Sequence, residues 1–529
     1  MNISRIPFAD VPQLSERDRM YAQGDERLSS FFKYPVELAA FSEVIKDRAK
    51  TTTDRQTLCS VLLEQHQSRG ISAPQRRHID ALQSPHTFTI VTAHQPSLFT
   101  GPLYYIYKIT SVLHLTQTLN EHYPDYQFVP VFVSGAEDHD FEEINHVRLF
   151  NKRLEWQSGE QGPVGAMKTA TLQPILEELK EVLGNGENAV HIYDIIHRCH
   201  TENTHYGPAA NALAHELFKD QGLLVLNMSD ARLKRLFIPV LKEELVNQPS
   251  KALVDAEGNR LEEAGFRQQA MAREINLFYL SEQSRERIVF ENGQYEVLNT
   301  SLHFSPEAML QELEARPERF SPNVVMRPLY QELILPNLAY IGGGGELAYW
   351  MERQTQFDHF GINFPMLIRR NSVLWIDKGS SKKRKKLGLD IIDLFADSDQ
   401  LVRQFVHRQS DEPLHLQEEK QQFQALFETI KTKATQVDPT LAKAVAAEAS
   451  RQFKAVEQLE GRLVRAEKQK HETALQQIRG LKEKLFPANG LQERHDNFLA
   501  FYLRYGTAFF EVLREALDPL EAGFVVVEE

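Results

Sequence analysis

Cysteine is scarce in this sequence. Only Cys59 and Cys199 occur among 529 residues, and they lie far apart. Two separated thiols exclude a disulfide framework and a cysteine-rich zinc site, because both need several cysteines at characteristic spacings. So few cysteines are typical of a protein from a reducing compartment.

Long apolar runs are also missing. No stretch approaches the roughly 18 consecutive apolar residues of a membrane span. The N-terminal segment MNISRIPFADVPQLSERDRM carries charges where a secretion signal has an apolar run. We therefore expect a cytoplasmic protein with no membrane partner.

An excess of positive charge is lacking as well. The 60 Lys and Arg residues are outnumbered by 73 Asp and Glu, which gives a formal net charge of -13. This balance disfavours non-specific binding to nucleic acid, so no nucleic-acid partner is expected. The length exceeds what one hydrophobic core usually serves, and two or more structural units are predicted.

Short apolar runs alternate with amphipathic stretches between about residues 85 and 376, which is typical of an α/β layer structure. A helix is predicted over 103–119. Strands are predicted at Thr87–Ala93, Gln127–Ser134, Gly222–Asn227, Asn323–Met326, Leu338–Ile341 and Pro365–Ile368. Because strands and helices alternate, parallel pairing with right-handed crossovers is favoured. We predict an α/β fold with a Rossmann-like parallel-sheet core over 1–390, with mainly helical connecting insertions at about 150–220 and 230–320.

The C-terminal part has a different composition. Residues 412–485 contain almost no glycine and much Gln, Glu, Lys and Ala, and apolar residues repeat at helical spacing on both sides of Asp438-Pro439. This pattern predicts an antiparallel α-helical coiled-coil arm over 391–485, with residues 486–529 packing back on the core. The arm either packs only on itself or offers apolar surface to a second copy.

The first polar cluster follows the strand at 87–93. His94 and Gln95 begin a loop that ends at Gly101-Pro102, before the predicted helix. Ligands of open parallel sheets bind beyond the carboxyl ends of the strands. His94 and Gln95 are therefore candidate substrate-binding residues; the structural alternative is a rigid turn in which His94 is bonded locally.

The second cluster follows the strand at 127–134. Glu137, Asp138, His139 and Asp140 are consecutive, and Asn145 is close behind. Such a charge density is costly unless the groups are solvated or used. The cluster could bind an ammonium group, hold Mg²⁺ on a nucleotide or supply a general base. We predict His139, Asp138 and Asp140 as catalytic residues, with His139 as the base and Asp138 or Asp140 binding an amino group, and Glu137 and Asn145 as substrate-binding residues. The alternative is an acidic helix start. No zinc spacing is matched, so no metal site is predicted.

The third cluster combines Arg327, Gln331 and Tyr349 with the glycine run Gly342, Gly343, Gly344 and Gly345. Arg327 suits a substrate carboxylate, because the guanidinium fork matches carboxylate geometry, and Gln331 and Tyr349 are further substrate-binding candidates. The glycines would let the backbone bind phosphate; the alternative is a tight turn. Neither a dinucleotide fingerprint nor a Walker motif is present.

The fourth cluster is basic. Arg369 is a substrate-binding candidate, and Lys382 and Lys383 open a run of five basic residues that could bind polyphosphate. The segment 378–382 is loosely similar to the mobile lysine-serine loop of class I aminoacyl-tRNA synthetases, although no His-x-x-His signature accompanies it. A solvated basic helix is the alternative.

Together these motifs resemble the bacillithiol biosynthesis cysteine-adding enzymes, the cysteine ligase family. The matching stretches are Gln95 with LFTGPLYYIYKI, GAEDHDFEEINH, RPLYQELILPNLAYIGGGGELAYW, LFPANGLQER and the segment 21–35. One departure is Ala93-His94, where the family usually has Gly-Gln. The resemblance implies a Rossmann-like core, a homodimer formed through the coiled coil, and amide formation between cysteine and glucosaminyl-malate.

Amide formation from a carboxylate needs activation, so ATP or another nucleotide with Mg²⁺ is the expected cofactor. Acyl-adenylate and acyl-phosphate routes both stay open. The rival interpretations are a non-catalytic scaffold that docks partners through the coiled coil, and an RNA nucleotidyltransferase, which the acidic net charge disfavours.

Overall fold

The computed structural model describes residues 1–281, 283–409 and 416–529. The chain divides into two compact units. The core unit comprises Asn2–Leu374 and Gln492–Val527; the arm unit comprises Trp375–Leu491 with Met1 and Glu528–Glu529. The arm is thus inserted into the core sequence, and the boundary predicted near residue 390 falls inside the arm unit.

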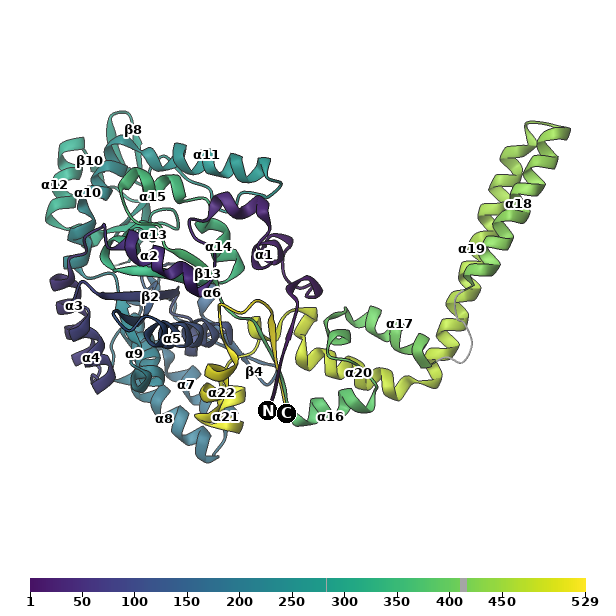
Figure 1. Cartoon of the computed structure of the whole chain (residues 1–529), viewed down its shortest axis with the longest axis horizontal. Helices are drawn as coiled ribbons and strands as arrows, with labels where there is room; N and C mark the ends of the chain where they lie inside the picture. The colour runs from purple at the N-terminus through teal and green to yellow at the C-terminus, as the bar shows by residue number, and fades with distance from the viewer. Residues whose placement is uncertain (282, 410–415) are drawn as a thin grey trace. The chain divides into compact units, whose positions relative to one another are not determined.

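A five-stranded parallel sheet forms the centre of the core unit (Figure 1). Its spatial order is β13 (Met366–Arg369), β12 (Asn337–Gly342), β2 (Thr87–His94), β3 (Gln127–Ser134) and β6 (Leu224–Asn227). The chain builds β2, β3 and β6 outward in one direction and then returns to add β12 and β13 on the other side of β2. Numbered along the chain, this is the strand order 3-2-1-4-5 of a Rossmann-like sheet, and the reversal between β2 and β12 creates a ligand crevice at the carboxyl ends of the strands. The predicted Rossmann-like core is confirmed.

Both faces of the sheet are buried, which explains its nearly continuous apolar runs. On one face Phe88 and Ile90 of β2 pack with residues of α2 (Phe41–Arg48) and α5 (Tyr104–His122). On the other face Val91 and Ala93 join the larger core cluster. That cluster also includes residues of α3 (Arg55–Gln67), α4 (Ala73–Ala81), α10 (Ala231–Asn247) and α13 (Arg327–Ile334).

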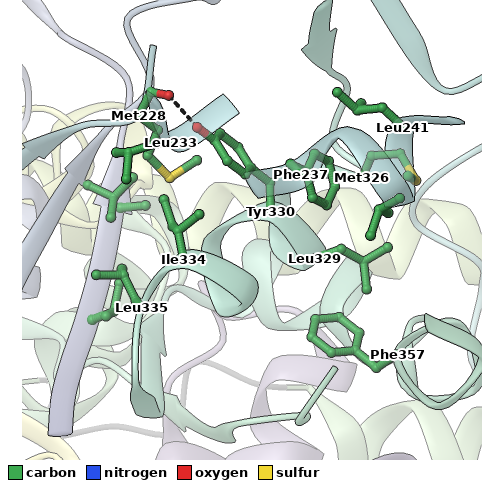
Figure 2. Packing of buried hydrophobic residues seen from close by; sticks show 14 of the residues in the cluster. Met228, Leu233, Phe237, Leu241, Met326, Leu329, Tyr330, Ile334, Leu335 and Phe357 are labelled. Atoms are coloured by element: carbon green, nitrogen blue, oxygen red, sulfur yellow. Dashed lines mark hydrogen bonds between the residues drawn. The ribbon is translucent and has the colours of Figure 1, made fainter. Parts of the chain in front are cut away.

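Tyr330 fixes α13 within this larger cluster. Its hydroxyl donates to the carbonyl oxygen of Met228 at 2.6 Å, and its ring lies 4.9 Å from that of Phe237 (Figure 2). Met228 follows β6, whereas Phe237 belongs to α10. The start of α13, which carries Arg327, is therefore held by packing on two neighbouring elements.

The insertions contain more strand than the sequence predicted. Their helices are α6 (Phe141–Ile144), α7 (Gln173–Leu183), α8 (Glu187–Thr201), α9 (Tyr206–Phe218), α11 (Pro249–Glu263) and α12 (Pro306–Ala315). A hairpin joins β4 (His146–Leu149) to β5 (Lys152–Glu155). An unpredicted antiparallel sheet has the order β10 (His303–Phe304), β9 (Gln294–Val297), β8 (Arg285–Glu291), β7 (Leu277–Leu280) and β11 (Phe320–Pro322). The available signal was Asn292-Gly293, whose positive φ angles of 52° and 79° form the β8–β9 turn.

The strand predicted at Asn323–Met326 is wrong. These residues form a turn before α13, because the Asn323 side chain accepts from the backbone nitrogens of Val325 and Met326 at 2.8 and 3.3 Å. An asparagine that bonds the backbone two residues ahead competes with strand pairing. Strand β11 ends at Pro322, one residue before the predicted strand begins.

The remaining elements of the core unit lie near its ends. They are β1 (Asn2–Ile6), α1 (Glu16–Ala22), α14 (Gly344–Trp350), α15 (Gln354–Phe360), α21 (Leu499–Tyr505) and α22 (Ala508–Ala516). Helix α21 packs on α8, and α22 packs on α5. Strands β14 (Val373–Ile376) and β15 (Phe524–Glu528) carry the chain from one unit to the other.

The arm unit is helical. It contains α16 (Lys378–Lys386), α17 (Ser398–Gln409), α18 (Gln417–Val437), α19 (Leu441–Lys470) and α20 (Glu472–Leu485). Helices α18 and α19 run antiparallel as a hairpin (Figure 1), which confirms the predicted coiled coil. The Asp438 carboxylate accepts from the Thr440 nitrogen at 2.8 Å and stabilises the turn between them. The start of the predicted helical pattern, 412–415, lies outside the described residues.

Helix α16 belongs to the arm because it packs on α20, and the adjoining Asp377 pairs with Lys484 of α20 at 2.6 Å. Across the described ranges, no helix has both the length and the apolar character needed to cross a membrane.

Candidate functional site

A cavity of about 620 Å³ lies in the core unit at the reversal point of the sheet. Its walls come from the residues that follow β2, β3 and β12, together with β8, the turn before α13, and α14. Of the predicted site residues, those lining it are His94, Gln95, Glu137, Asp138, Arg327, Gly343, Gly345 and Tyr349. Three clusters that are far apart in the sequence therefore meet at one edge of the sheet.

Two of the four acidic residues that line the cavity, Glu137 and Asp138, are held by different partners. Lys234 of α10 is fully buried and lies 2.8 Å from Glu137, and its charge lowers the pKa of Glu137 although burial alone would raise it. Asp138 accepts from the Gln95 amide at 2.5 Å. Burial opposes ionisation of Asp138, but this bond and the nearby Arg285 lower its pKa below the usual range. Both groups are therefore carboxylates at neutral pH.

His94 faces the same cavity as a neutral imidazole. Its Nδ1 lies 2.9 Å from the Gln95 carbonyl oxygen, which only accepts, so Nδ1 carries the proton and Nε2 has the lone pair. Burial, assisted by the Lys108 charge, lowers the pKa of His94 to about 4. A neutral imidazole with an unprotonated Nε2 can accept a proton from a substrate.

The catalytic residues predicted next to Asp138 lie elsewhere. His139 is half exposed and does not line the cavity, and its Nδ1 accepts from Arg285 at 3.1 Å, so that lone pair is engaged. Asp140 is exposed at the start of α6. Asn145 is buried, and its side-chain oxygen contacts His146 Nδ1 at 3.1 Å. The geometry thus favours His94 over His139 as the base.

An ion pair in the cavity wall was not predicted from the sequence. Lys108 of α5 is 1% exposed and lies 2.6 Å from both the Ala93 carbonyl oxygen and the Glu346 carboxylate. Glu346 also accepts from the Gly343 nitrogen and the Tyr340 hydroxyl, each at 2.8 Å. Burial would raise the pKa of Glu346, but Lys108 lowers it to about 2. The available signal was a lysine among the apolar and aromatic residues of the first turns of α5, YYIYKI.

The glycine run serves packing at two of its four positions. A Cβ on Gly344 would lie 2.2 Å from the Asp18 carboxyl carbon, and one on Gly342 would lie 2.9 Å from the Tyr340 ring. Gly343 donates its N–H to Glu346, whereas Gly345 faces open space. Phosphate binding stays a prediction for Gly343 and Gly345, which line the cavity; Gly342 and Gly344 do not.

Two neighbouring arginines have different surroundings. Arg369 is buried in a double contact with Asp18, at 2.6 and 3.1 Å, and does not line the cavity. Arg370 does line it and pairs with Glu493 at 2.8 Å. The Arg370 Nε is buried without a hydrogen-bond partner among the described residues. The substrate contact predicted for Arg369 is thus replaced by a structural pair, and Arg370 is the arginine that faces the cavity.

Arg327 and Tyr349 meet in the cavity wall, where the Arg327 Nη2 lies 3.3 Å from the Tyr349 hydroxyl. Gln331 is buried behind them. Its side-chain oxygen accepts from Arg327 at 3.0 Å, and its side-chain nitrogen donates to Glu332 at 2.8 Å. Gln331 therefore orients Arg327 instead of lining the cavity.

Lys382 and Lys383 are exposed on α16 of the arm unit, whereas all residues lining the cavity belong to the core unit. Their phosphate role stays a prediction. Across the described part of the chain, no group of three or more His, Cys, Asp or Glu side chains is arranged to hold a metal ion.

Comparisons with known proteins agree with this architecture. Residues 1–371 match the family model described as bacillithiol biosynthesis BshC, N-terminal Rossmann-like domain, and residues 373–529 match its C-terminal coiled-coil domain. A protein named "Putative cysteine ligase BshC" from Flavobacterium johnsoniae is 40% identical, covering 96% of both chains. Its namesake from Christiangramia forsetii is 39% identical, covering 96% of this chain and 95% of its own. Among solved structures, a chain titled as a putative arginyl-tRNA synthetase from Campylobacter jejuni matches with 12% identity and a TM-score of 0.22, covering 84% of this chain and 97% of its own. That score is too low to indicate a shared fold.

Proposed function

We propose, since this chain belongs to the bacillithiol biosynthesis BshC family, that its ligase activity joins the carboxyl group of cysteine to the amino group of glucosaminyl-malate. The observation that carries this proposal is the pairing, in one cavity, of a neutral His94 with the ionised Asp138. An amine substrate needs both groups: a carboxylate to hold its ammonium form and a base to take the proton.

Amide formation creates a carbon–nitrogen bond and breaks the bond between the acyl carbon and the activating group, which leaves with one of the carboxyl oxygens. Asp138 orients the ammonium form of the amine, which loses its first proton to water. His94 Nε2 accepts the second proton as the nitrogen attacks, because that nitrogen becomes strongly acidic once it is bonded to the acyl carbon. Arg327 supplies positive charge for a substrate carboxylate, and Tyr349 and Gln331 hold its guanidinium in place.

The cavity also suits a nucleotide that would activate the carboxyl group. Arg370 lines the cavity, and its Nε has no hydrogen-bond partner among the described residues, so this arginine fits a phosphate oxygen. ATP, when bound, would convert the carboxylate into a better electrophile. Mg²⁺ would enter with the phosphates, since the described residues include no metal-binding cluster of their own.

The arm is proposed to form a homodimer. No described residue of α18 or α19 is buried, and apolar side chains stay exposed along both helices. Leu426 is 53% exposed, Leu459 is 53% exposed and Leu463 is 45% exposed. A second arm packed on this surface would remove these side chains from water.

Mass spectrometry tests the reaction directly. Purified protein is incubated with cysteine, glucosaminyl-malate, ATP and Mg²⁺, and both the thiol product and the nucleotide are followed. The amide product with AMP would support an adenylate route, and the product with ADP an acyl-phosphate route. Failure to form product with any nucleoside triphosphate would count against the proposed reaction.

A further inference from the structure

A second hollow of about 300 Å³ adjoins the main cavity. The two share five lining residues, which are His94, Gln95, Tyr104, Glu143 and Arg494. We call the second hollow the side chamber; its own lining residues are Ser97, Pro102, His146, Val147, Arg148 and His495. One ligand can therefore occupy the chamber and extend past His94 into the main cavity.

The side chamber has an excess of positive charge. Arg148 of β4 and Arg494 both line it, and neither guanidinium has an ion-pair or hydrogen-bond partner in the described part of the chain. The Nδ1 atoms of His146 and His495 already contact the side-chain oxygens of Asn145 and Asp496, and Glu143 is the one carboxylate among the residues that line the chamber. Two unpaired arginines facing one hollow suit a ligand with more than one negative charge.

The position of Arg148 is electrostatically unfavourable without a ligand. In the β4–β5 hairpin it lies directly opposite Arg153, and like charges at opposed positions destabilise a strand pair. Arg153 pairs with Glu155 at 2.9 Å, so that carboxylate is already engaged. An anion in the chamber would compensate the charge of Arg148.

The chamber is built on a rigid frame. The Asn497 nitrogen donates to the Arg148 carbonyl oxygen at 3.1 Å, which ties the segment after Arg494 to β4. The Asn497 side chain donates to the carbonyl oxygens of Phe99 and Gly101 at 2.9 and 2.6 Å. Phe99 has a φ of 46°, a strained value for a non-glycine residue that these bonds maintain. The two arginines therefore project from backbone that is fixed in advance.

We propose that the side chamber binds the malate half of the sugar substrate, with Arg148 and Arg494 pairing with its two carboxylates. This assignment rests on the proposed function, in which the substrate is an amino sugar carrying a dicarboxylate. The amino sugar then passes His94 and places its amine near Asp138. Arg327 is less suited to malate, because both of its Nη atoms already contact Gln331 and Tyr349.

Binding and kinetics test the assignment together. Titration calorimetry with glucosaminyl-malate compares the wild type with Arg148→Gln and Arg494→Gln, and methyl glucosaminide serves as the ligand without carboxylates. Each variant should raise the Kd for glucosaminyl-malate at least ~10-fold, since a charge-assisted pair is lost. Binding of methyl glucosaminide should not change. Lys152→Gln is the matched control: Lys152 lies on the same hairpin opposite Leu149, pairs with Glu178 at 2.7 Å and does not line the chamber, so this variant should bind like the wild type.

The kinetic readout separates this proposal from the ligase assignment. In the variants the KM for glucosaminyl-malate should rise, with the KM for cysteine unchanged. If the wild type is an active ligase and neither arginine substitution changes the Kd or the KM for glucosaminyl-malate, the malate site in the side chamber is wrong and the ligase assignment stands. An inactive wild type that still binds glucosaminyl-malate through both arginines would support the side chamber and count only against the proposed reaction.

Discussion

The core unit and the α18–α19 hairpin of the arm differ in where they place charged and apolar side chains. In the core unit Lys108, Lys234 and Arg370 are almost completely buried, and each contacts a carboxylate within 3 Å. In the arm hairpin, ion pairs such as Lys431 with Glu428 lie at the surface, and no described residue of α18 or α19 is buried. Buried charge is expensive and is kept where chemistry or specificity requires it, whereas exposed apolar surface indicates assembly.

The largest expected effect is on turnover, and it comes from substituting the histidine that faces the cavity. His94→Asn should lower kcat by ~10²- to 10⁴-fold, because a general base is removed. The matched His139→Asn should change kcat by no more than a few-fold, since His139 is half exposed and lies outside the cavity. Steady-state assays of product formation decide between them, and the reverse order of effects would restore His139 as the base.

Removing the cation of the Lys108–Glu346 pair should lower the free energy of unfolding of the core. Lys108→Met removes the buried cation from the Glu346 carboxylate, which is 26% exposed in the cavity wall, and should destabilise the fold by ~1–3 kcal/mol. Lys50→Met is the control, because Lys50 is exposed and pairs with Asp47 at the surface, so little change is expected. Denaturant unfolding followed by circular dichroism measures both; equal stabilities would show that the buried pair contributes nothing.

The glycine run provides a matched pair within one helix. Gly344→Ala should destabilise the core by ~1–3 kcal/mol, because its Cβ would overlap the Asp18 carboxylate. Gly345→Ala meets nothing within 4 Å and should be neutral or slightly stabilising. Thermal unfolding of the two variants compares them. If Gly345→Ala keeps its stability and loses turnover, the run also contacts a ligand.

A substitution on the exposed apolar surface of the arm should weaken self-association and leave turnover unchanged. Leu459→Glu places a charge on the exposed apolar surface and should weaken the proposed dimer at least ~10-fold. Gln422→Glu changes an exposed polar position of α18 and should have no such effect. Analytical ultracentrifugation measures the equilibrium, and a monomeric wild type would contradict the dimer.

The smallest expected effect is on pH dependence. With a folded-state pKa of about 4, His94 stays neutral through pH 5, so its contribution to turnover should fall only as the pH approaches 4. The unfolded chain binds this proton nearer pH 6.5, so His94 reduces the free energy of unfolding progressively as the pH falls from about 6.5 to 4. A pH–rate profile with a limb near 6.5 would contradict the buried, neutral assignment.

The sequence predicted the central sheet well, because strands buried on both faces have apolar runs that need no knowledge of their neighbours. The antiparallel sheet was missed, since strands such as β8 are short, half exposed and rich in charge. Arg369 and Arg370 show where local reasoning ends: they are consecutive, yet one contacts Asp18 and the other Glu493. Which arginine faces the cavity depends on carboxylates more than a hundred residues away in the sequence. The local sequence around Arg369 and Arg370 contains no information about these partners.

The insertion of the arm before Gln492 also has a consequence in time. Glu493 and Arg494 are synthesised only after the entire arm, although Glu493 neutralises Arg370 and Arg494 lines both hollows. A ribosome-bound chain that has completed all five strands of the sheet still has an unpaired Arg370 and an incomplete cavity wall. A product truncated before Gln492 therefore lacks the carboxylate that pairs with Arg370 and the arginine shared by both hollows.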